Sequence, residues 1–212
     1  MARPIIASAA KERRLLDDQE KSVAKAELEN TTPINANTGV IKAGNGLSAR
    51  HAAEKWADEN LLTPLVFTTE AGNVAFDKNS VKDSLAHGYG QAKLDAIPTL
   101  PEGFPNATYL GSHDDWNRPG TINHYFAYPI IYDGKLNYVF CRALDDVNTN
   151  RLYVHEVFVA EKLKGNALQT AAKLLHSKPH GGIAFYRNIL TDVLNAKVQQ
   201  KSDTPNLSEE KT

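Results

Sequence analysis

The sequence is poor in the residue patterns that mark the common enzyme chemistries. Cys141 is the one cysteine among 212 residues, so no internal disulfide can form and a reducing compartment is the natural location. Because Cys141 lies in an apolar run, a small core residue is a better interpretation than a nucleophile. The chain has no G-x-S-x-G nucleophile elbow and no Walker phosphate loop. Its seven histidines lack the spacing of zinc ligands, so we expect neither a metal ion nor a cofactor.

Long apolar runs are absent as well. No segment approaches the roughly 18 consecutive apolar residues of a membrane-spanning helix, and the N-terminus has no apolar run of signal-peptide length. The sequence therefore predicts no membrane contact and a cytoplasmic location, unless the protein is exported by a route that the sequence does not show.

The chain has no large excess of one charge, but its charges are unevenly placed. The formal net charge is −1, whereas residues 162–201 contain seven cations and one acid. A basic segment of this kind can attract an anion even in a neutral protein, although a solvated helix face explains it equally well. A glycine-bearing loop at 176–182 precedes a predicted helix, so it is either an anion site or a plain interhelical loop. The substrate-binding candidates of this region are Thr170, Lys173, Lys178 and His180.

Composition divides the chain into three parts. Residues 1–46 form a charged N-terminal segment followed by a linker rich in Asn, Thr and Gly. Residues 47–197 have the length of one domain of roughly 150 residues. Residues 198–212 are polar, and we expect them to be disordered.

Periodicity predicts a mixture of helices and strands within the domain. The predicted helices are 49–61, 80–87, a short piece around Lys93, 168–175 and 186–194. The predicted strands are 65–68, 74–76, 123–132, 136–144 and 151–159. The last three form an antiparallel meander, because Asp133-Gly134-Lys135 is a hairpin signal. Residues 98–120, which are rich in Pro and Gly, are predicted as a long loop.

These elements indicate an α+β fold. We expect N-terminal helices packed on a small antiparallel sheet, made of the three-strand meander plus one or more short strands. Two C-terminal helices would close the domain.

The most informative short stretch is Tyr153-Val154-His155-Glu156-Val157, in the last strand of the meander. Histidine titrates near neutral pH and is a natural acid or base. Strand alternation places His155 on one face with Tyr153 and Val157, and turns Glu156 to the other face. Glu156 is therefore a poor partner for His155, and we expect the partner to come from elsewhere, with His87 or Arg142 as the better candidates.

The chemistry that remains is metal-free acid–base catalysis by His, Lys, Arg, Tyr and Thr. That set suits RNA cleavage, in which a base removes the ribose 2′-OH proton and an acid protonates the 5′-oxygen. Cations stabilise the charge that develops on the phosphate. His87, His155 and Arg142, with Lys82 or Lys93, would be sufficient if they converge. Tyr125 and Tyr153 are further substrate-binding candidates.

Three stretches resemble one family of nucleases. They are Asp77–Gly88 (DKNSVKDSLAHG), the hairpin Tyr125–Arg142 and the strand Arg151–Val157. Together they look like the phage-associated barnase/EndoU/colicin/RelE-like nuclease domains, which occur in large polyvalent phage proteins and in polymorphic toxins. The resemblance covers roughly residues 40–195 and rests on the order of segments rather than on one diagnostic motif.

The resemblance implies a fold, an activity and a site. The fold would be N-terminal helices on a four-stranded antiparallel sheet, with the active site on the open face. The activity would be that of a metal-independent RNase acting on RNA such as tRNA, as a phage or mobile-element toxin or effector in the cytoplasm of a host bacterium. Delivery would be by phage or by secretion, and an immunity or inhibitor protein would be a partner. His87 and His155 take the acid–base roles, Arg142 contacts phosphate, and Lys93 and Thr170 are weaker candidates.

Two other functions stay open at this point. One is a non-catalytic module of a phage polyprotein that binds nucleic acid or a protein through residues 162–201. The other is an ADP-ribosyltransferase using Arg142 and Glu156, although no NAD-binding pattern is visible.

Overall fold

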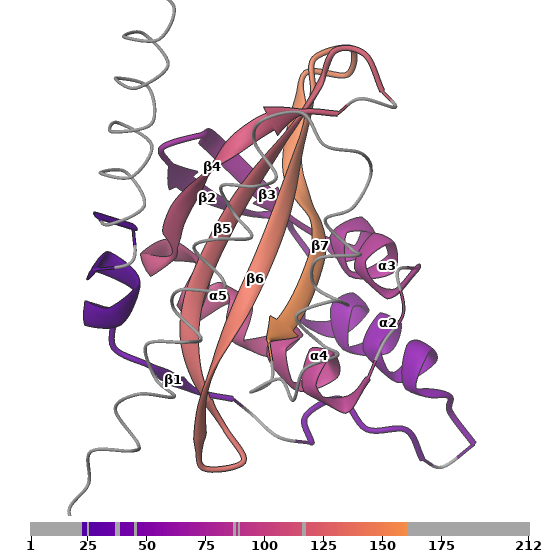
Figure 1. Ribbon diagram of the computed structural model, residues 1–212. Helices are drawn as coiled ribbons and strands as arrows, with labels where there is room; N and C mark the ends of the chain where they lie inside the picture. Colours follow the sequence, from indigo (N-terminus) through magenta and orange to yellow (C-terminus); the bar gives the residue numbers. More distant parts are fainter. Residues whose placement is uncertain are drawn as a thin grey trace, which may run out of the picture.

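The protein is built around one seven-stranded sheet that curls around its helices (Figure 1). The computed structural model describes residues 23–24, 26–36, 39–44, 46–86, 88, 90–115 and 118–160. The strands follow the order β1-β5-β6-β7-β3-β2, and β4 also pairs with β5. Their bounds are β1 Ile34–Asn35, β2 Leu65–Thr69, β3 Gly72–Phe76, β4 Thr108–Asp114, β5 Thr121–Tyr132, β6 Lys135–Asp146 and β7 Arg151–Ala160.

The helices are short, and most of them lie on one side of the sheet (Figure 1). They are α2 Ala49–Asn60, α3 Lys78–Ala86, α4 Gln91–Ala96 and α5 Leu100–Gly103, with the 3₁₀ turns η1 Ile97–Thr99 and η2 Phe104–Asn106. Residues 26–30 are also helical. Among the described residues, no helix is both long enough and apolar enough to cross a membrane.

The predicted fold class is wrong, because the sheet dominates the structure and is not purely antiparallel. β1 pairs with β5 in parallel, and β3 pairs with β7 in parallel at Ala75 and Tyr153. These pairings join segments far apart in the sequence, and no local pattern reports such a contact. The result is a mixed, half-barrel sheet rather than helices packed on a small antiparallel one. The two predicted C-terminal helices lie outside the described residues.

The three-strand meander is present as predicted. β5 pairs antiparallel with β6, and β6 with β7, over most of their lengths. The turn between β5 and β6 has positive φ at Asp133 (50°) and Gly134 (68°). Two central residues with positive φ are typical of the tight hairpin turns that match the twist of paired strands. Alternation and turn chemistry therefore sufficed to find this part of the sheet.

The prediction of a long loop over residues 98–120 is wrong for much of this segment, because the segment contains most of η1 and all of α5, η2 and β4. Pro98, Pro101 and Pro105 stand in the first turns of these short helices, where the missing backbone N–H costs nothing. At Gly103 a Cβ atom would lie 2.2 Å from the Tyr128 ring, so a side chain there would collide. The next residue, Phe104, packs against Phe67 and Phe126 at centroid distances of 5.0 and 4.9 Å.

Helix α3 begins at Lys78, two residues before the predicted start of this helix at residue 80. The Asp77 carboxylate accepts a hydrogen bond from the Ser80 N–H at 2.9 Å, and the Ser80 hydroxyl accepts one from the Asp77 N–H at 3.2 Å. This reciprocal pair is a capping box built from Asp and Ser. Asp77 also forms an ion pair with Arg151, so the cap fastens the helix to β7.

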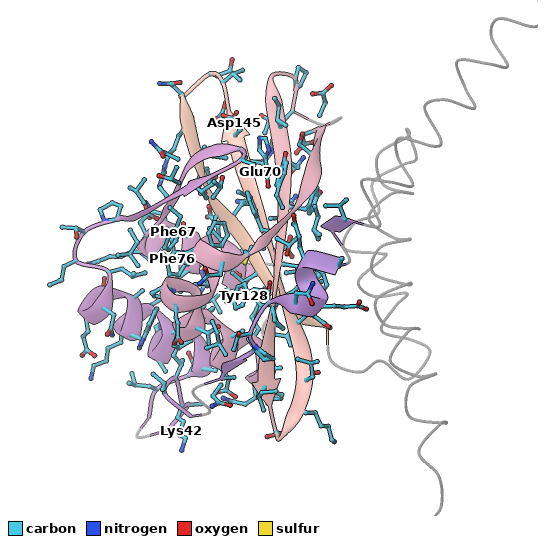
Figure 2. The ribbon with its side chains drawn as sticks, turned by 90° about the vertical axis from the view of Figure 1, so that its left-hand side faces the viewer. Lys42, Phe67, Glu70, Phe76, Tyr128 and Asp145 are labelled. Carbon is cyan, nitrogen blue, oxygen red and sulfur yellow. The ribbon has the colours of Figure 1, made fainter. Side chains whose placement is uncertain are left out.

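Each face of the sheet buries its own cluster. The helix-bearing face holds the larger one, which includes Phe67, Phe76 and Tyr128 (Figure 2). Cys141 is fully buried there and burial raises the pKa of its thiol, which confirms its interpretation as a core residue. The second face has a smaller cluster of Ala24, Leu28, Leu110, Tyr125, Ala127, Tyr138 and Phe140.

Helix α3 takes the place of a neighbouring strand along part of β7. Beyond the β3 pairing at Tyr153, the Val157 N–H donates to the Ser84 hydroxyl at 3.0 Å. The same hydroxyl donates to the Val157 carbonyl at 3.4 Å. Ser84 is fully buried, so one side chain provides both hydrogen bonds to these two buried backbone groups.

Replacing Ser84 by alanine tests this contact. We expect Ser84→Ala to lower the free energy of unfolding by about 1–3 kcal/mol, because two buried backbone groups lose their partner. Urea titration of the full chain measures the loss. Thr63→Ala, at an exposed position, is the control and should change stability by less than about 0.5 kcal/mol. Equal stability of the two variants would show that the hydroxyl does not support β7.

Candidate functional site

A β-bulge in β7 determines which side chains meet. On β6, Arg142 pairs with Glu156 and the next residue, Ala143, pairs with Val154, so His155 is an extra residue in β7. A bulge of this kind interrupts the alternation of side chains. Glu156 therefore lies on the same face as Arg142, and Val157 falls opposite Cys141 in the main core. The expectation that His155 shares a face with Val157 while Glu156 points away from the site is wrong.

The side chain of His155 extends from β7 to α3. Its ring packs edge-on against the Tyr153 ring, with centroids 5.9 Å apart. Its Nδ1 atom is 3.4 Å from Oδ2 of Asp83 on α3. The His155 side chain is 11% exposed and that of Asp83 is 39% exposed, so the pair is at the border of solvent.

Arg142 and Glu156 form a largely buried ion pair. Nη2 of Arg142 is 3.1 Å from Oε2 of Glu156, and the two side chains are 20% and 5% exposed. Nη1 of Arg142 also donates to Asn123 Oδ1 at 3.4 Å. Within the described part of the chain, Nε of Arg142 and Oε1 of Glu156 are buried without a hydrogen-bond partner. This ion pair therefore keeps one unused donor and one unused acceptor, and such groups in a native structure require an explanation.

Lys93 brings a second cation to this cluster. Its Nζ donates to the carbonyls of Ser84 at 2.7 Å and Gly88 at 2.9 Å. Burial lowers the pKa of Lys93 to about 8, and the negative charge of Glu156 opposes part of that shift. A lysine with this pKa is charged at pH 7 but can exchange its proton near neutral pH.

The two predicted tyrosines lie on this face of the sheet in different surroundings. Tyr125 is 6% exposed. The pKa of Tyr125 is raised to about 12, mainly by burial. The positive charge of Arg142 opposes this shift, and the negative charges of Glu156 and Asp115 add to it. Tyr153 is half-buried, and the guanidinium carbon of Arg151 lies 4.5 Å from its ring centre. Burial raises the pKa of Tyr153, and the neighbouring charge of Asp83 raises it further.

The structure brings together five of the predicted site residues: Tyr125, Arg142, Tyr153, His155 and Lys93. Lys82 is exposed on α3, the helix that carries Asp83. The other candidates, His87, Thr170, Lys173, Lys178 and His180, lie outside the described residues and stay predictions.

Asp83 had no role in the site predicted from the sequence, and Glu156 was set aside as a partner of His155 because regular alternation was assumed. Glu156 entered only with Arg142, in the alternative of an ADP-ribosyltransferase. A bulge leaves no mark in a single sequence, so the alternation of β7 could not be corrected in advance. For Asp83 the sequence offered one weak signal, which is that it lies one helical turn before the predicted site residue His87.

A second polar cluster, which sequence reasoning also missed, lies on the helix-bearing face, at the end of the sheet where Figure 2 labels Asp145 and Glu70. Nδ1 of His124 is 2.9 Å from the Tyr109 hydroxyl, and Nε2 of His124 is 4.0 Å from Asp145 Oδ2. Burial lowers the pKa of His124, which favours the neutral ring. Within the described ranges, no three His, Cys, Asp or Glu side chains are grouped as metal ligands.

Comparison with known proteins gives one match. The family model of large polyvalent protein-associated domain 3 matches residues 44–153, which is just over half of the chain. The match runs from the segment before α2 to Tyr153 in β7, so that His155 and Glu156 lie just beyond it. Neither the curated proteins nor the solved structures contain a match.

The environment of Lys93 predicts a change of stability with pH. Its folded-state pKa lies below the ordinary lysine value of 10.5, so the unfolded chain binds more protons between about pH 8 and 10.5 and stability rises with pH there. The gain is on the order of 3 kcal/mol. Lys93→Met should remove this rise in urea titrations across the window.

The matched control is Lys82→Met, at an exposed position on the neighbouring helix. It should keep the wild-type dependence on pH. If Lys93→Met and Lys82→Met show the same alkaline rise, the lowered pKa of Lys93 is refuted.

Proposed function

We propose that this chain, which belongs to the family of large polyvalent protein-associated domain 3, cleaves RNA without a metal ion at the bulge of β7. The family associates the chain with the large polyvalent proteins of phages. It does not specify a reaction, so the proposal depends on the site. The observation that carries it is the bulge, with His155 beside Asp83 and next to the Arg142–Glu156 pair.

In the proposed reaction, His155 is the base. It takes the proton of a ribose 2′-OH, the 2′-oxygen forms a bond to the adjacent phosphorus, and the bond from phosphorus to the 5′-oxygen breaks. A second group gives the 5′-oxygen its proton. The nuclease resemblance assigns that role to His87, and this assignment stays a prediction.

Arg142 and Lys93 are the proposed phosphate-binding cations. In the free protein, the Arg142 guanidinium makes one contact with Glu156 and keeps Nε unused. A phosphate can engage two guanidinium donors at once, which is a stronger arrangement than a single contact with a carboxylate. Glu156 would then keep the nearby charge of Lys93 as its partner.

Tyr153, Tyr125 and Lys82 are the proposed contacts to the rest of the RNA. Stacking of a base on an aromatic ring contributes about 1–3 kcal/mol and tolerates any sequence. The half-buried ring of Tyr153 is beside His155, which suits a base next to the cleaved bond. Lys82 is exposed and suits a backbone phosphate farther along the strand. A tRNA substrate, an inhibitor protein and action in the bacterial cytoplasm belong to the same proposal.

A non-catalytic binding module is the second candidate. The observation that favours it is the burial of the charges around the bulge, where Glu156 is 5% exposed and already paired with Arg142. In that case the chain would retain RNA in a salt-dependent way and leave it intact.

RNA cleavage in the presence of EDTA separates the two candidates. We expect the full chain to cut tRNA or total RNA and to leave 2′,3′-cyclic phosphate ends. His155→Gln should reduce the rate by about 10²–10⁴-fold, the usual contribution of a general acid or base. His51→Gln, an exposed histidine on α2, should stay within about twofold of wild type.

Intact RNA under every condition, with salt-sensitive retention, would replace the first candidate by the second. Equal rates for wild type and His155→Gln would show that the chemistry lies elsewhere.

A further inference from the structure

Asp83 lies on α3 next to the bulge of β7. Neither the sequence nor the family match assigns a role to its carboxylate. We infer that Asp83 is a positioning residue for His155. It holds Nδ1, so that the ring exchanges a proton with the substrate through Nε2. The catalytic part of this inference rests on the proposed function, whereas the effect of Asp83 on the His155 ring does not.

Helix α3 is fastened to β7 on both sides of Asp83, which makes the contact reproducible. Asp77 pairs with Arg151 at the start of the helix. Ser84, the residue directly after Asp83, hydrogen-bonds the backbone of Val157, two residues beyond His155. A side chain between two such ties has little freedom to drift away from the ring, as the positioning of a catalytic group requires.

Other charged groups around His155 are already engaged. Glu156 contacts Arg142, and Lys93 donates to two backbone carbonyls. Tyr153 meets the His155 ring edge-on. The Asp83 carboxylate lies within ion-pair distance of a His155 ring nitrogen, at 3.4 Å.

A carboxylate at Nδ1 acts on the histidine in two ways. The 3.4 Å contact is an ion-pair distance without hydrogen-bond geometry. In the proposed role the carboxylate closes this gap and accepts the Nδ1 proton, which leaves the lone pair on Nε2 available to take a proton. It also stabilises the imidazolium that forms once the 2′-OH proton has moved to Nε2. Because Asp83 is 39% exposed, solvent screens part of its charge and the effect on the pKa of His155 should be moderate.

The direct test is a ¹⁵N NMR titration of His155 in the full chain. In wild type we expect the neutral ring to carry its proton on Nδ1. Asp83→Asn removes the negative charge, so the pKa of His155 should fall by about 0.5–1 unit. Asp58→Asn is the control, because Asp58 is an exposed carboxylate that pairs with Lys78 at 3.0 Å and should leave His155 unchanged.

RNA cleavage supplies the second readout. With Asp83→Asn, kcat should fall at least tenfold with KM within about twofold, and the acid limb of the pH–rate profile should move to lower pH. Asp83→Glu should recover part of the rate, since it restores the charge on a longer side chain. Urea titration confirms that each variant is folded, and Asp83→Ser replaces Asp83→Asn if the latter is not.

The outcomes separate the two proposals. If wild type cleaves RNA and Asp83→Asn keeps both the pKa of His155 and the rate, the positioning role is wrong and the proposed function stands. If the pKa shifts as expected but wild type leaves RNA intact, the function is wrong and the Asp83–His155 coupling stands.

Discussion

The hydrogen bonds between the Ser84 hydroxyl and the backbone of Val157 are the contact on which the site depends. They fix α3 at the edge of β7 where the neighbouring strand β3 no longer pairs. Asp83 reaches His155 because the next residue is held in this way. The bulge at His155 also lies within the stretch of β7 that α3 supports. A small polar side chain thus connects the packing of a helix to the geometry of a candidate catalytic group.

Buried charge is the second constraint, and it opposes stability. Moving Arg142, Glu156 and Lys93 out of water costs free energy that a single ion-pair contact seldom offsets. An apolar set of the same size would pack without unused donors or acceptors. Groups that are unfavourable for folding but lie close together at a strand irregularity are a common property of functional sites. That coincidence, rather than any one distance, is why the bulge is the best-supported location for chemistry.

Local signals predicted local structure well and distant contacts badly. The β5–β6 hairpin followed from alternation and from Asp133-Gly134, and α2 followed from its apolar spacing after Ser48. The parallel pairing of β3 with β7 had no such signal, because it depends on how the whole chain closes on itself. For the site, residue chemistry pointed to Arg142, Lys93 and His155. It could not assign their partners, because one extra residue in a strand reverses every face that follows it.

The sequence by itself determined the chemical inventory: one buried thiol, no metal-ligand spacing, and histidine, arginine and lysine as the groups able to move protons or bind phosphate. It also determined the meander, since alternation and turn residues act over a few positions. Only the tertiary structure decided that Glu156 joins Arg142 and that Asp83 joins His155. The physical reason is that a bulge and a helix–strand contact are set by packing across the fold, which leaves no periodic trace in the residues themselves.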